Sequence, residues 1–263
     1  MRAIGFLGGS FDPVHHGHVG LAQAALDQLG LEEVRFIPAA QSWQKGAPGA
    51  SGAQRAAMLR LALASTPRLG VDERELVRGG TSYTIDTARA LRAECGAETA
   101  LCLLLGADQF LNLPTWRDWR GLLDLVNLAV AGRPGYELNQ QHWPAEIVGA
   151  CASRLVYPPE TACTKAFGAV HLIDMAPADI SATRLRAWLA QRAAAGARPA
   201  AAHRAGAAAK ETAPAETAPA ETAPAETAPA GNTLAAPANV AEAGMLAAAV
   251  LDYIDRHQLY SGA

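Results

Sequence analysis

The sequence lacks the features that mark membrane, secreted and disulfide-rich proteins. No apolar stretch in its 263 residues is long enough to span a bilayer. The N-terminus carries a single Arg2 and a short apolar run that ends in glycines, which is not the pattern of a signal peptide. The 4 cysteines show no C-x-x-C motif and no metal-site spacing, and Cys102, inside an apolar run, is expected to be a small buried thiol. We therefore expect a soluble cytoplasmic protein without a membrane partner.

An excess of charge of one sign is also missing. The formal net charge is −3, which gives no indication of a nucleic-acid partner or of binding to an anionic membrane surface. Two common nucleotide-binding motifs are absent as well. The first glycines do not form G-x-G-x-x-G, no acidic residue closes the second predicted strand to hold a ribose, and G-x-x-x-x-G-K-[ST] occurs nowhere. The dinucleotide fingerprint and the P-loop are thereby excluded.

Apolar runs and helical periodicity alternate along most of the chain. Hydrophobic residues make up 50% of it, ample for a sizeable core, and its length is that of one or two domains. Strands are predicted at residues 3–7, 33–38, 69–72, 99–105, 128–131 and 169–174, and helices at 19–29, 53–65, 84–93 and 116–125. Ser82 or Thr84 is expected to cap the helix at 84–93. The alternation predicts an open, doubly wound parallel α/β sheet of the Rossmann-like type, with the run at 99–105 near its centre.

A glycine- and histidine-rich stretch, residues 8–18, joins the first predicted strand to the first predicted helix. Gly8 and Gly9 have no Cβ, so the backbone of this turn can come close to a ligand. The helix that begins nearby has unpaired backbone amides at its N-terminus, and its dipole favours anions there. His15 and His18 are three residues apart, so within a first helical turn they project on the same side. These features predict a phosphate-binding site.

The histidine pair has two other interpretations, a metal site and ordinary surface histidines. A metal site is disfavoured, because H-E-x-x-H is absent and no third ligand stands at a suggestive spacing. Ordinary surface histidines are the second alternative. The combination of G-G-S-F-D-P at 8–13 with H-x-G-H at 15–18, at a strand-to-helix turn, argues against them. We therefore expect no metal ion bound by the protein itself at these residues.

Three separate segments follow predicted strands, and ligands of doubly wound sheets bind beyond the carboxyl ends of the strands. They are the loop at 8–18, the turn at 106–108 and the segment at 174–181, which we expect to meet at one edge of the sheet. The last segment leads into a helix that ends near residue 193, with Ser181 as its N-cap. Thr183, Arg186 and the amides of the first turn are placed to grip phosphate oxygens from the side opposite the histidines.

These motifs resemble those of the H-x-G-H nucleotidyltransferase superfamily, which includes adenylyltransferases and, more distantly, class I aminoacyl-tRNA synthetases. The K-M-S-K-S loop of the synthetases is missing. Residues 180–186 are similar to the adenylyltransferase motif I-S-S-T-x-I-R, with departures at Ala182 and Leu185. Segments at 81–87, 106–109 and 114–116 narrow the resemblance to the bacterial nicotinate-nucleotide adenylyltransferases, over roughly residues 1–192 and the final helix.

The resemblance implies a role for each matching residue. His15 and His18 bind the triphosphate of ATP and, with Arg186, stabilise charge as pyrophosphate leaves. The other residues implied for ATP are Gly8, Gly9, Ser10, Phe11, Gly106, Asp108, Ser181 and Thr183, of which Asp108 holds the ribose. Those implied for nicotinic acid mononucleotide are Lys45, Tyr83, Thr84, Trp116, Arg117 and Arg133. In that site Trp116 stacks on the nicotinate ring, and amides around Thr84 and Arg117 receive its carboxylate.

The chain departs from the family pattern in two places. Many members carry P-P-H-[KR] after the second strand, where this chain has Ser-Trp-Gln-Lys at 42–45, so Gln44 replaces the histidine while Lys45 remains available for a phosphate. Residues 193–244 are dominated by Ala, Pro, Glu, Thr and Gly, with four tandem copies of Glu-Thr-Ala-Pro-Ala at 211–230. Prolines without large apolar residues predict a disordered, extended insertion.

Helical periodicity returns at residues 245–260, where Leu246, Val250 and Ile254 are spaced by four. This segment resembles the closing helix of the family. The expected organisation is a catalytic domain at 1–192, the insertion at 193–244, and a C-terminal segment at 245–263 whose helix packs back on the catalytic domain.

The resemblance implies an enzyme of NAD biosynthesis that joins nicotinic acid mononucleotide to the AMP of ATP, giving deamido-NAD and pyrophosphate. The attacking phosphate is already an anion, so we expect direct in-line displacement without a general base or a covalent intermediate. Mg²⁺ bridging the ATP phosphates is implied by the chemistry, with no evident protein ligand. The alternatives are a sister enzyme that uses nicotinamide mononucleotide or phosphopantetheine, and a non-catalytic ATP sensor. No feature of the sequence predicts an oligomeric state.

Overall fold

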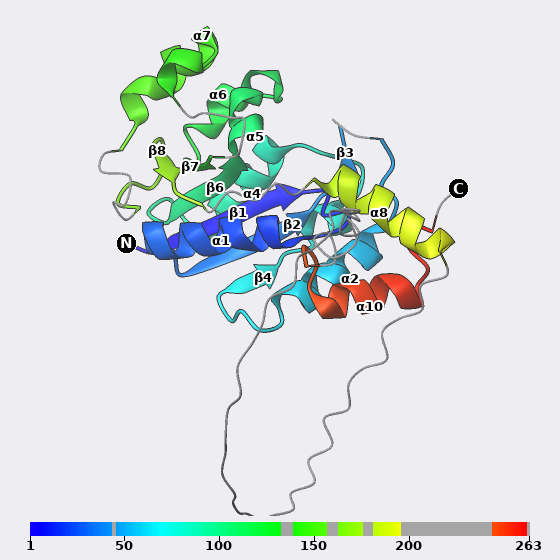
Figure 1. Cartoon of the computed structure of the whole chain (residues 1–263). Coiled ribbons are helices and arrows are strands. Elements are labelled where there is room, and N and C mark those ends of the chain that lie inside the picture. The colour runs from blue at the N-terminus through cyan, green and yellow to red at the C-terminus, as the bar shows by residue number, and fades with distance from the viewer. Residues whose placement is uncertain (44–45, 133–138, 157–162, 176–180, 196–243, 262–263) are drawn as a thin grey trace, which may run out of the picture.

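A six-stranded parallel sheet forms the centre of the molecule (Figure 1). The structure is a computed structural model that describes residues 1–43, 46–132, 139–156, 163–175, 181–195 and 244–261. The strands are β1 (Ala3–Gly9), β2 (Glu33–Pro38), β4 (Leu69–Val71), β6 (Ala100–Gly106), β7 (Asn127–Ala131) and β8 (Val170–Ile173). Their order is β4-β2-β1-β6-β7-β8, and all neighbours run parallel. The predicted doubly wound α/β sheet is confirmed.

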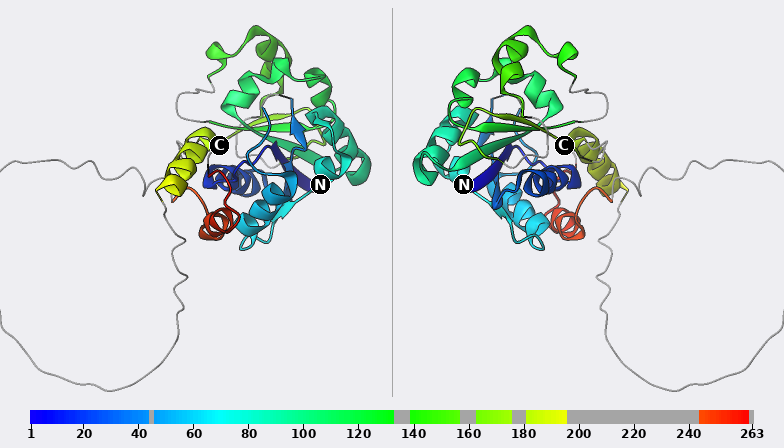
Figure 2. Two further views of the ribbon diagram at one scale, coloured as in Figure 1. Left: turned by 90° about the vertical axis from the view of Figure 1, so that its right-hand side faces the viewer. Right: turned by 90° about the vertical axis from the view of Figure 1, so that its left-hand side faces the viewer.

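Helices cover both faces of this sheet, as the side views in Figure 2 show. One face carries α1 (His16–Leu29), α2 (Gly52–Leu63), α8 (Ala182–Ala194) and α10 (Ala248–Arg256). The other carries α4 (Thr84–Cys95), α5 (Ala107–Leu111), α6 (Trp119–Leu122) and α7 (Ala145–Cys151). The remaining described helices are α3 (Arg74–Arg78) and the 3-10 turns η1 (Leu113–Thr115), η2 (Gln140–His142) and η3 (Ala152–Arg154). Each face therefore has its own hydrophobic core.

The central strands supply side chains to both cores because successive residues of a strand point to opposite faces. Along β1, Ala3 and Leu7 belong to one core, whereas Ile4 and Phe6 belong to the other. Both strands in the middle of the sheet are covered on both faces, which explains why their sequences are continuous apolar runs. The pattern at 99–105 predicted this central position correctly, and β6 lies one residue further along the chain.

Cys102 is fully buried in β6, as expected, but it has a second thiol beside it. Its Sγ lies 3.1 Å from Sγ of Cys163, which is also buried. The side chains of Asn127 and His171 approach the Cys163 sulfur at 3.6 and 3.7 Å. The burial was predictable from the apolar run, whereas a neighbour 61 positions along the chain was not.

The helix predicted at 116–125 is wrong. Trp116 has an extended backbone after η1, and the only regular helical turn is α6. Asp118 causes the difference, because it adopts a φ of 49° in the left-handed region, which a right-handed helix does not accommodate. Its carboxylate accepts a hydrogen bond from Arg89 Nη2 at 2.7 Å. The aromatic and leucine residues of this segment stand at helical spacing, and this spacing wrongly predicted a continuous helix.

The expected cap of the helix at 84–93 is also wrong. The N-cap of α4 is Tyr83, and no side chain bonds to the cap amides. The Ser82 hydroxyl instead accepts a hydrogen bond from the Ala40 amide at 3.1 Å. It thereby links the two strands of a small parallel sheet, β3 (Gln41–Ser42) and β5 (Thr81–Ser82), which the sequence analysis missed because each strand has two residues.

The C-terminal segment lies against α2 and α8 (Figure 1). Leu246, Val250 and Ile254 are buried in the core that contains α1 and α2. Arg192 of α8 forms an ion pair of 2.6 Å with Asp255 of α10. The helix itself is shorter than the predicted 245–260, because α10 spans Ala248–Arg256 and residues 258 and 260 have positive φ values.

The expected disordered insertion at 193–244 lies outside the described residues from 196 to 243, and its first residues still belong to α8. Among the helices that the structure describes, none is long and apolar enough to cross a membrane.

Candidate active site

The two central strands part at their carboxyl ends. Hydrogen-bonded pairing of β1 with β2 continues as far as Gly9 and Pro38. Pairing of β1 with β6 stops at Phe6 and Leu103, although both strands run on for three more residues. The strand order also reverses direction between β1 and β6, which is where open α/β sheets bind their ligands. The candidate site is therefore at this edge.

The loop that follows β1, residues 8–18, lies at this edge. A Cβ built on the exposed Gly8 meets no atom within 4 Å, so the backbone there is open to a ligand. A Cβ on Gly9 would lie 3.2 Å from the Phe11 ring. Phe11 adopts a φ of 49° and its ring is 2% exposed, packed against Phe36. Phe11 thus anchors the loop in the core.

His15 and His18 lie at the N-terminus of α1. His15 is the N-cap and is buried, so the helix begins at residue 16 and not at 19 as predicted. The two imidazole rings stack, with centroids 3.7 Å apart and planes 24° apart. The His15 amide donates to Nδ1 of His18 at 3.3 Å. A neutral His18 therefore carries its proton on Nε2, which makes that nitrogen a hydrogen-bond donor beside the positive end of the helix dipole.

A buried arginine that the sequence analysis missed forms a hydrogen bond to the histidine loop. Arg55 of α2 is 1% exposed and donates to three carbonyl oxygens, of Ser10 at 2.7 Å, Ala39 at 2.7 Å and Ala50 at 3.3 Å. Its burial lowers the pKa of the guanidinium, and the nearby Asp12 opposes that shift. Three separate segments are fixed to one cation in this way.

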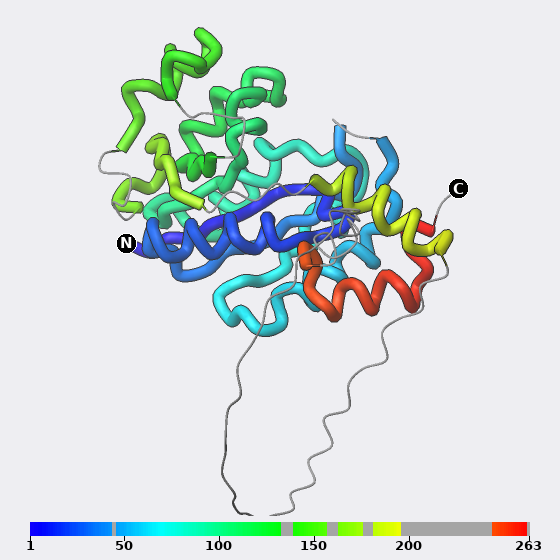
Figure 3. Tube along the Cα trace, in the orientation of Figure 1, coloured from blue at the N-terminus to red at the C-terminus, as the bar shows by residue number. Residues whose placement is uncertain are grey.

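The start of α8 meets this loop, as predicted. Arg186 Nη1 donates to the carbonyl oxygen of Asp12 at 2.7 Å, and its Nη2 lies 3.3 Å from the Thr183 hydroxyl. Figure 3 shows the yellow tube of α8 beginning beside the end of the blue β1. Ser181 occupies the N-cap position, although its side chain makes no capping hydrogen bond. Arg186 and Thr183 are therefore already oriented toward each other.

The turn after β6 supplies the third predicted segment. Gly106 is the N-cap of α5, and Asp108 lies in the first turn of that helix. Its Oδ2 accepts a hydrogen bond from Gln109 Nε2 at 2.9 Å. Since β6 is the strand that parts from β1, the turn lies on the far side of the separation from the histidine loop.

The aromatic and basic residues predicted for the second substrate form a separate group. The guanidinium of Arg117 lies 4.8 Å from the centre of the Tyr83 ring. Tyr83 and Trp116 both pack, half-buried, against the core that contains α4. Thr84 is the first residue of α4, so its amide belongs to a helix N-terminus. Four of the six predicted residues thus come from two neighbouring segments.

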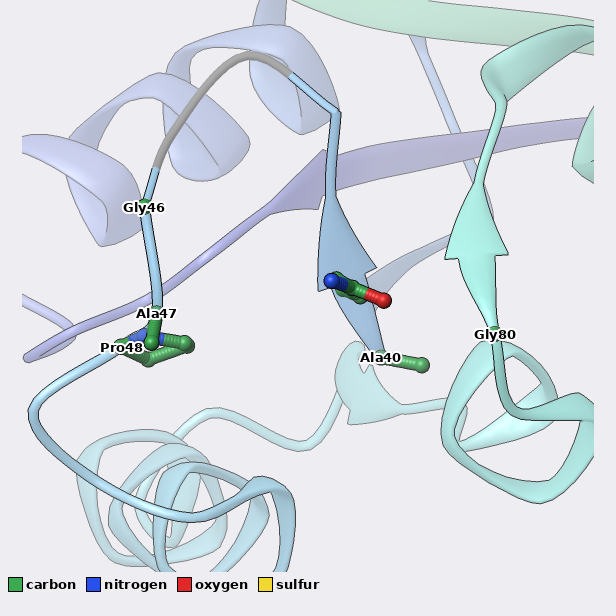
Figure 4. A pocket seen from close by; sticks show the side chains of 6 residues that line it. Ala40, Gly46, Ala47, Pro48 and Gly80 are labelled. Atoms are coloured by element: carbon green, nitrogen blue, oxygen red, sulfur yellow. The ribbon is translucent and has the colours of Figure 1, made fainter.

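A hollow of about 490 Å³ lies at the small sheet of β3 and β5 (Figure 4). It is lined by Ala40, Gln41, Gly46, Ala47, Pro48 and Gly80. Small side chains and backbone form its walls, so a ligand there would meet mostly main-chain groups. Gln44, Lys45 and Arg133 lie outside the described residues, and the two former directly precede the lining residue Gly46.

Known proteins resemble this chain in sequence and in fold. A family model described as cytidylyltransferase-like matches residues 6–187. A probable nicotinate-nucleotide adenylyltransferase of Chromobacterium violaceum is 45% identical over 194 residues, which cover 71% of this chain and 87% of the relative. A protein of the same name from Bordetella petrii is 42% identical over 201 residues, covering 76% and 93%.

A solved structure supports the fold alone. It is the Plasmodium falciparum nicotinic acid mononucleotide adenylyltransferase complexed with NaAD, which has a TM-score of 0.56 and 15% identity and covers 73% of this chain and 85% of that one. The family match and the sequence identities of 45% and 42% show the family, whereas an identity of 15% shows only the fold. The chain belongs to the cytidylyltransferase-like family and, within it, to the nicotinate-nucleotide adenylyltransferases.

Proposed function

We propose that this protein transfers the adenylyl group of ATP to nicotinic acid mononucleotide, giving deamido-NAD and pyrophosphate. The observation that carries the proposal is the meeting of the histidine loop with α8, where Arg186 reaches the Asp12 carbonyl at 2.7 Å. Two imidazoles, a helix N-terminus and a guanidinium are proposed to surround one position. That combination suits a triphosphate whose two terminal phosphates leave together.

ATP is proposed to lie across the parting of β1 and β6. Gly8, Gly9, Ser10 and Phe11 present backbone to it, and His15 and His18 take the triphosphate. Ser181, Thr183 and Arg186 hold the phosphates from the α8 side, while Gly106 and Asp108 receive the ribose across the parting.

Nicotinic acid mononucleotide is proposed to occupy the neighbouring group of residues. Trp116 offers an aromatic face to the electron-poor ring, and the amides near Thr84 and Arg117 donate hydrogen bonds to its carboxylate. Tyr83 supports Arg117 through its ring. Lys45 and Arg133 are proposed to neutralise the phosphate, and the hollow beside Gly46 gives that end of the substrate room.

The reaction needs little covalent chemistry from the protein. A phosphate oxygen of the mononucleotide attacks the α-phosphorus of ATP, and the bond to pyrophosphate breaks on the opposite side. No proton is removed from the nucleophile, so no general base is required. His18, its Nε2 a donor, and Arg186 lower the barrier by neutralising charge that develops on the leaving group.

Mg²⁺ is proposed to arrive with ATP. Among the described residues there is no group of three or more His, Cys, Asp or Glu side chains that could hold a metal ion. Phosphate oxygens are ligands that Mg²⁺ accepts readily, and it commonly keeps several waters. The bound ion would reduce the charge of the triphosphate, and the protein residues above do the positioning.

Pyrophosphate release tests the proposal. Wild-type protein is incubated with ATP and Mg²⁺ together with nicotinic acid mononucleotide, nicotinamide mononucleotide or phosphopantetheine. We expect strong turnover with the first acceptor and little with the other two. Turnover with another acceptor would overturn the proposed acceptor site. ATP binding without turnover on any acceptor would favour a sensor over an enzyme.

A further inference from the structure

A tyrosine near the C-terminus contacts the histidine loop directly. The Tyr260 hydroxyl donates to Oδ1 of Asp12 at 2.6 Å, across 248 positions of sequence. Asp12 lies in the loop between β1 and α1 and is 6% exposed. The same segment makes a second contact with this loop, because the amide of His16 donates to the carbonyl oxygen of Met245 at 2.9 Å. Residues on both sides of α10 therefore touch the proposed ATP site.

Asp12 is the point through which this contact acts. Its Oδ2 accepts from the Gly49 amide at 2.8 Å, and its Oδ1 accepts from the Ala50 amide at 3.1 Å. Its carbonyl oxygen takes the Arg186 hydrogen bond described above. One buried residue thus joins the histidine loop, the segment that enters α2 and the phosphate-binding arginine of α8.

The Tyr260 ring packs closely against the backbone of Gly49. A Cβ built on Gly49 would lie 2.9 Å from two atoms of that ring, so only glycine leaves room for it. Tyr260 has a φ of 60° and Gln258 a φ of 50°, and both are unfavourable for residues with side chains. Such conformations persist where the surrounding contacts enforce them. The chain after α10 is bent toward the site at a conformational cost.

The phenol keeps its proton in this environment. Burial and the neighbouring Asp12 both raise the pKa of Tyr260, while Arg186 and Arg55 oppose the shift. The hydroxyl is therefore a donor at every pH at which the enzyme would work. A carboxylate that is nearly excluded from water needs such donors, because an unsatisfied buried charge is costly.

We propose that Tyr260 is a positioning residue for adenylyl transfer. Its hydroxyl fixes the Asp12 carboxylate and thereby sets the histidine loop and Arg186 in the arrangement that receives the triphosphate. The inference rests on the proposed function for its catalytic readout, and ATP binding supplies a readout that is independent of the acceptor.

The test compares Tyr260→Phe with Tyr253→Phe in the full-length protein. Tyr253 lies on α10, where its ring contacts His257, so Tyr253→Phe is the matched loss of one phenol hydroxyl. We expect kcat/KM for ATP to fall about tenfold in Tyr260→Phe and to stay within twofold of wild type in Tyr253→Phe. Circular dichroism verifies that each sample is folded at the assay temperature.

Three readouts separate positioning from a structural role. Partial unfolding lowers kcat in proportion to the folded fraction and leaves KM for ATP unchanged. Mispositioning of the histidine loop instead weakens ATP binding in a sample that is fully folded. In a double-mutant cycle with Asp12→Asn, we expect the second substitution to add little to the first. Calorimetric titration with ATP and Mg²⁺, without acceptor, is expected to show a Kd at least threefold weaker for Tyr260→Phe.

Gly49→Ala is a second variant that leaves the hydroxyl in place. Its Cβ must displace the Tyr260 ring, so we expect it to reproduce the weaker ATP binding, while Gly70→Ala, where nothing lies within 4 Å, serves as control. Folded Tyr260→Phe with kcat/KM and Kd within twofold of wild type would overturn the inference. Wild-type protein that binds ATP but transfers nothing would overturn the proposed function, and the ATP titrations would still decide the role of Tyr260.

Discussion

Arg55 offers the sharpest test of how the candidate site is supported. It is a cation with 1% exposure whose three hydrogen bonds end on main-chain carbonyls of three different segments. Arg55→Met keeps a long, flexible side chain that fills much of the same space. It removes all three donors, and it leaves the carbonyls of Ser10, Ala39 and Ala50 without this partner in a partly buried region.

The magnitude follows from the geometry. Hydrogen bonds to charged groups contribute about 1.5–3 kcal/mol each, so the two bonds of 2.7 Å represent about 3–6 kcal/mol, and the bond of 3.3 Å adds less. Removing the cation recovers part of this, because burial disfavours the charged guanidinium and lowers its pKa. We expect a net loss of about 3 kcal/mol in the free energy of unfolding. For a chain of this size that corresponds to a Tm about 6–12 °C lower.

The assay is thermal unfolding of wild type, Arg55→Met and Arg60→Met. Arg60 lies on the same helix, but its side chain is 59% exposed and pairs with Glu73 at the surface, so its loss is expected to cost less than about 1 kcal/mol. The two variants change net charge equally. If Arg55→Met unfolds within 2 °C of Arg60→Met, on the order of 0.5–1 kcal/mol at this size, the carbonyl contacts do not hold the loop.

Three further predictions concern the reaction, the insertion and the alkaline limit of stability. His18→Ala should retain the wild-type Tm and lose a factor of at least about 10² in kcat, measured by pyrophosphate release, while the exposed neighbour His16→Ala stays near wild type. Deleting residues 196–240 should leave both Tm and turnover nearly intact, since loop closure depends only logarithmically on length; a large loss of either would show that the segment is structural. Burial raises the pKa of Cys151 from 9.0 to about 11, so the stability gained by keeping this thiol neutral is complete below pH 9 and lost as pH rises to 11. Relative to Cys151→Ala, the free energy of unfolding of wild type should fall by about 2–3 kcal/mol over that range. If the free energies of unfolding of the two proteins change in parallel with pH, the raised pKa is contradicted.

The strands were predictable because their signal is local. An apolar run marked β2 with both ends correct, and β6 to within one residue. The helix after Trp116 was not predictable, because a left-handed residue at position 118 interrupts a periodicity that is intact in the sequence. The one-turn and two-residue elements escaped detection because they carry too few residues for any period.

The candidate site likewise contains residues that the sequence predicted and residues that it did not. The histidine loop and the arginine of α8 were predicted to meet because both follow strands, and the Arg186–Asp12 contact shows that they do. Arg55 and Tyr260 were missed because their partners are a set of backbone carbonyls and one distant carboxylate. An arginine within an apolar helix ordinarily indicates the solvent-facing side. Neither the carbonyls nor the fold that gathers them is visible in a residue pattern.

The bond between Tyr260 and Asp12 also has a consequence for biosynthesis of the protein. The ribosome makes Asp12 first and Tyr260 248 residues later, which at about 5–20 residues per second is an interval on the order of 12–50 s. Once β8 has been made, the nascent chain can form its sheet, but the Asp12 carboxylate still lacks the Tyr260 donor. Products that end between α10 and residue 260 would keep the buried residues of α10 and lose this hydrogen bond, and an affinity tag joined directly after residue 260 would crowd the residue that forms it.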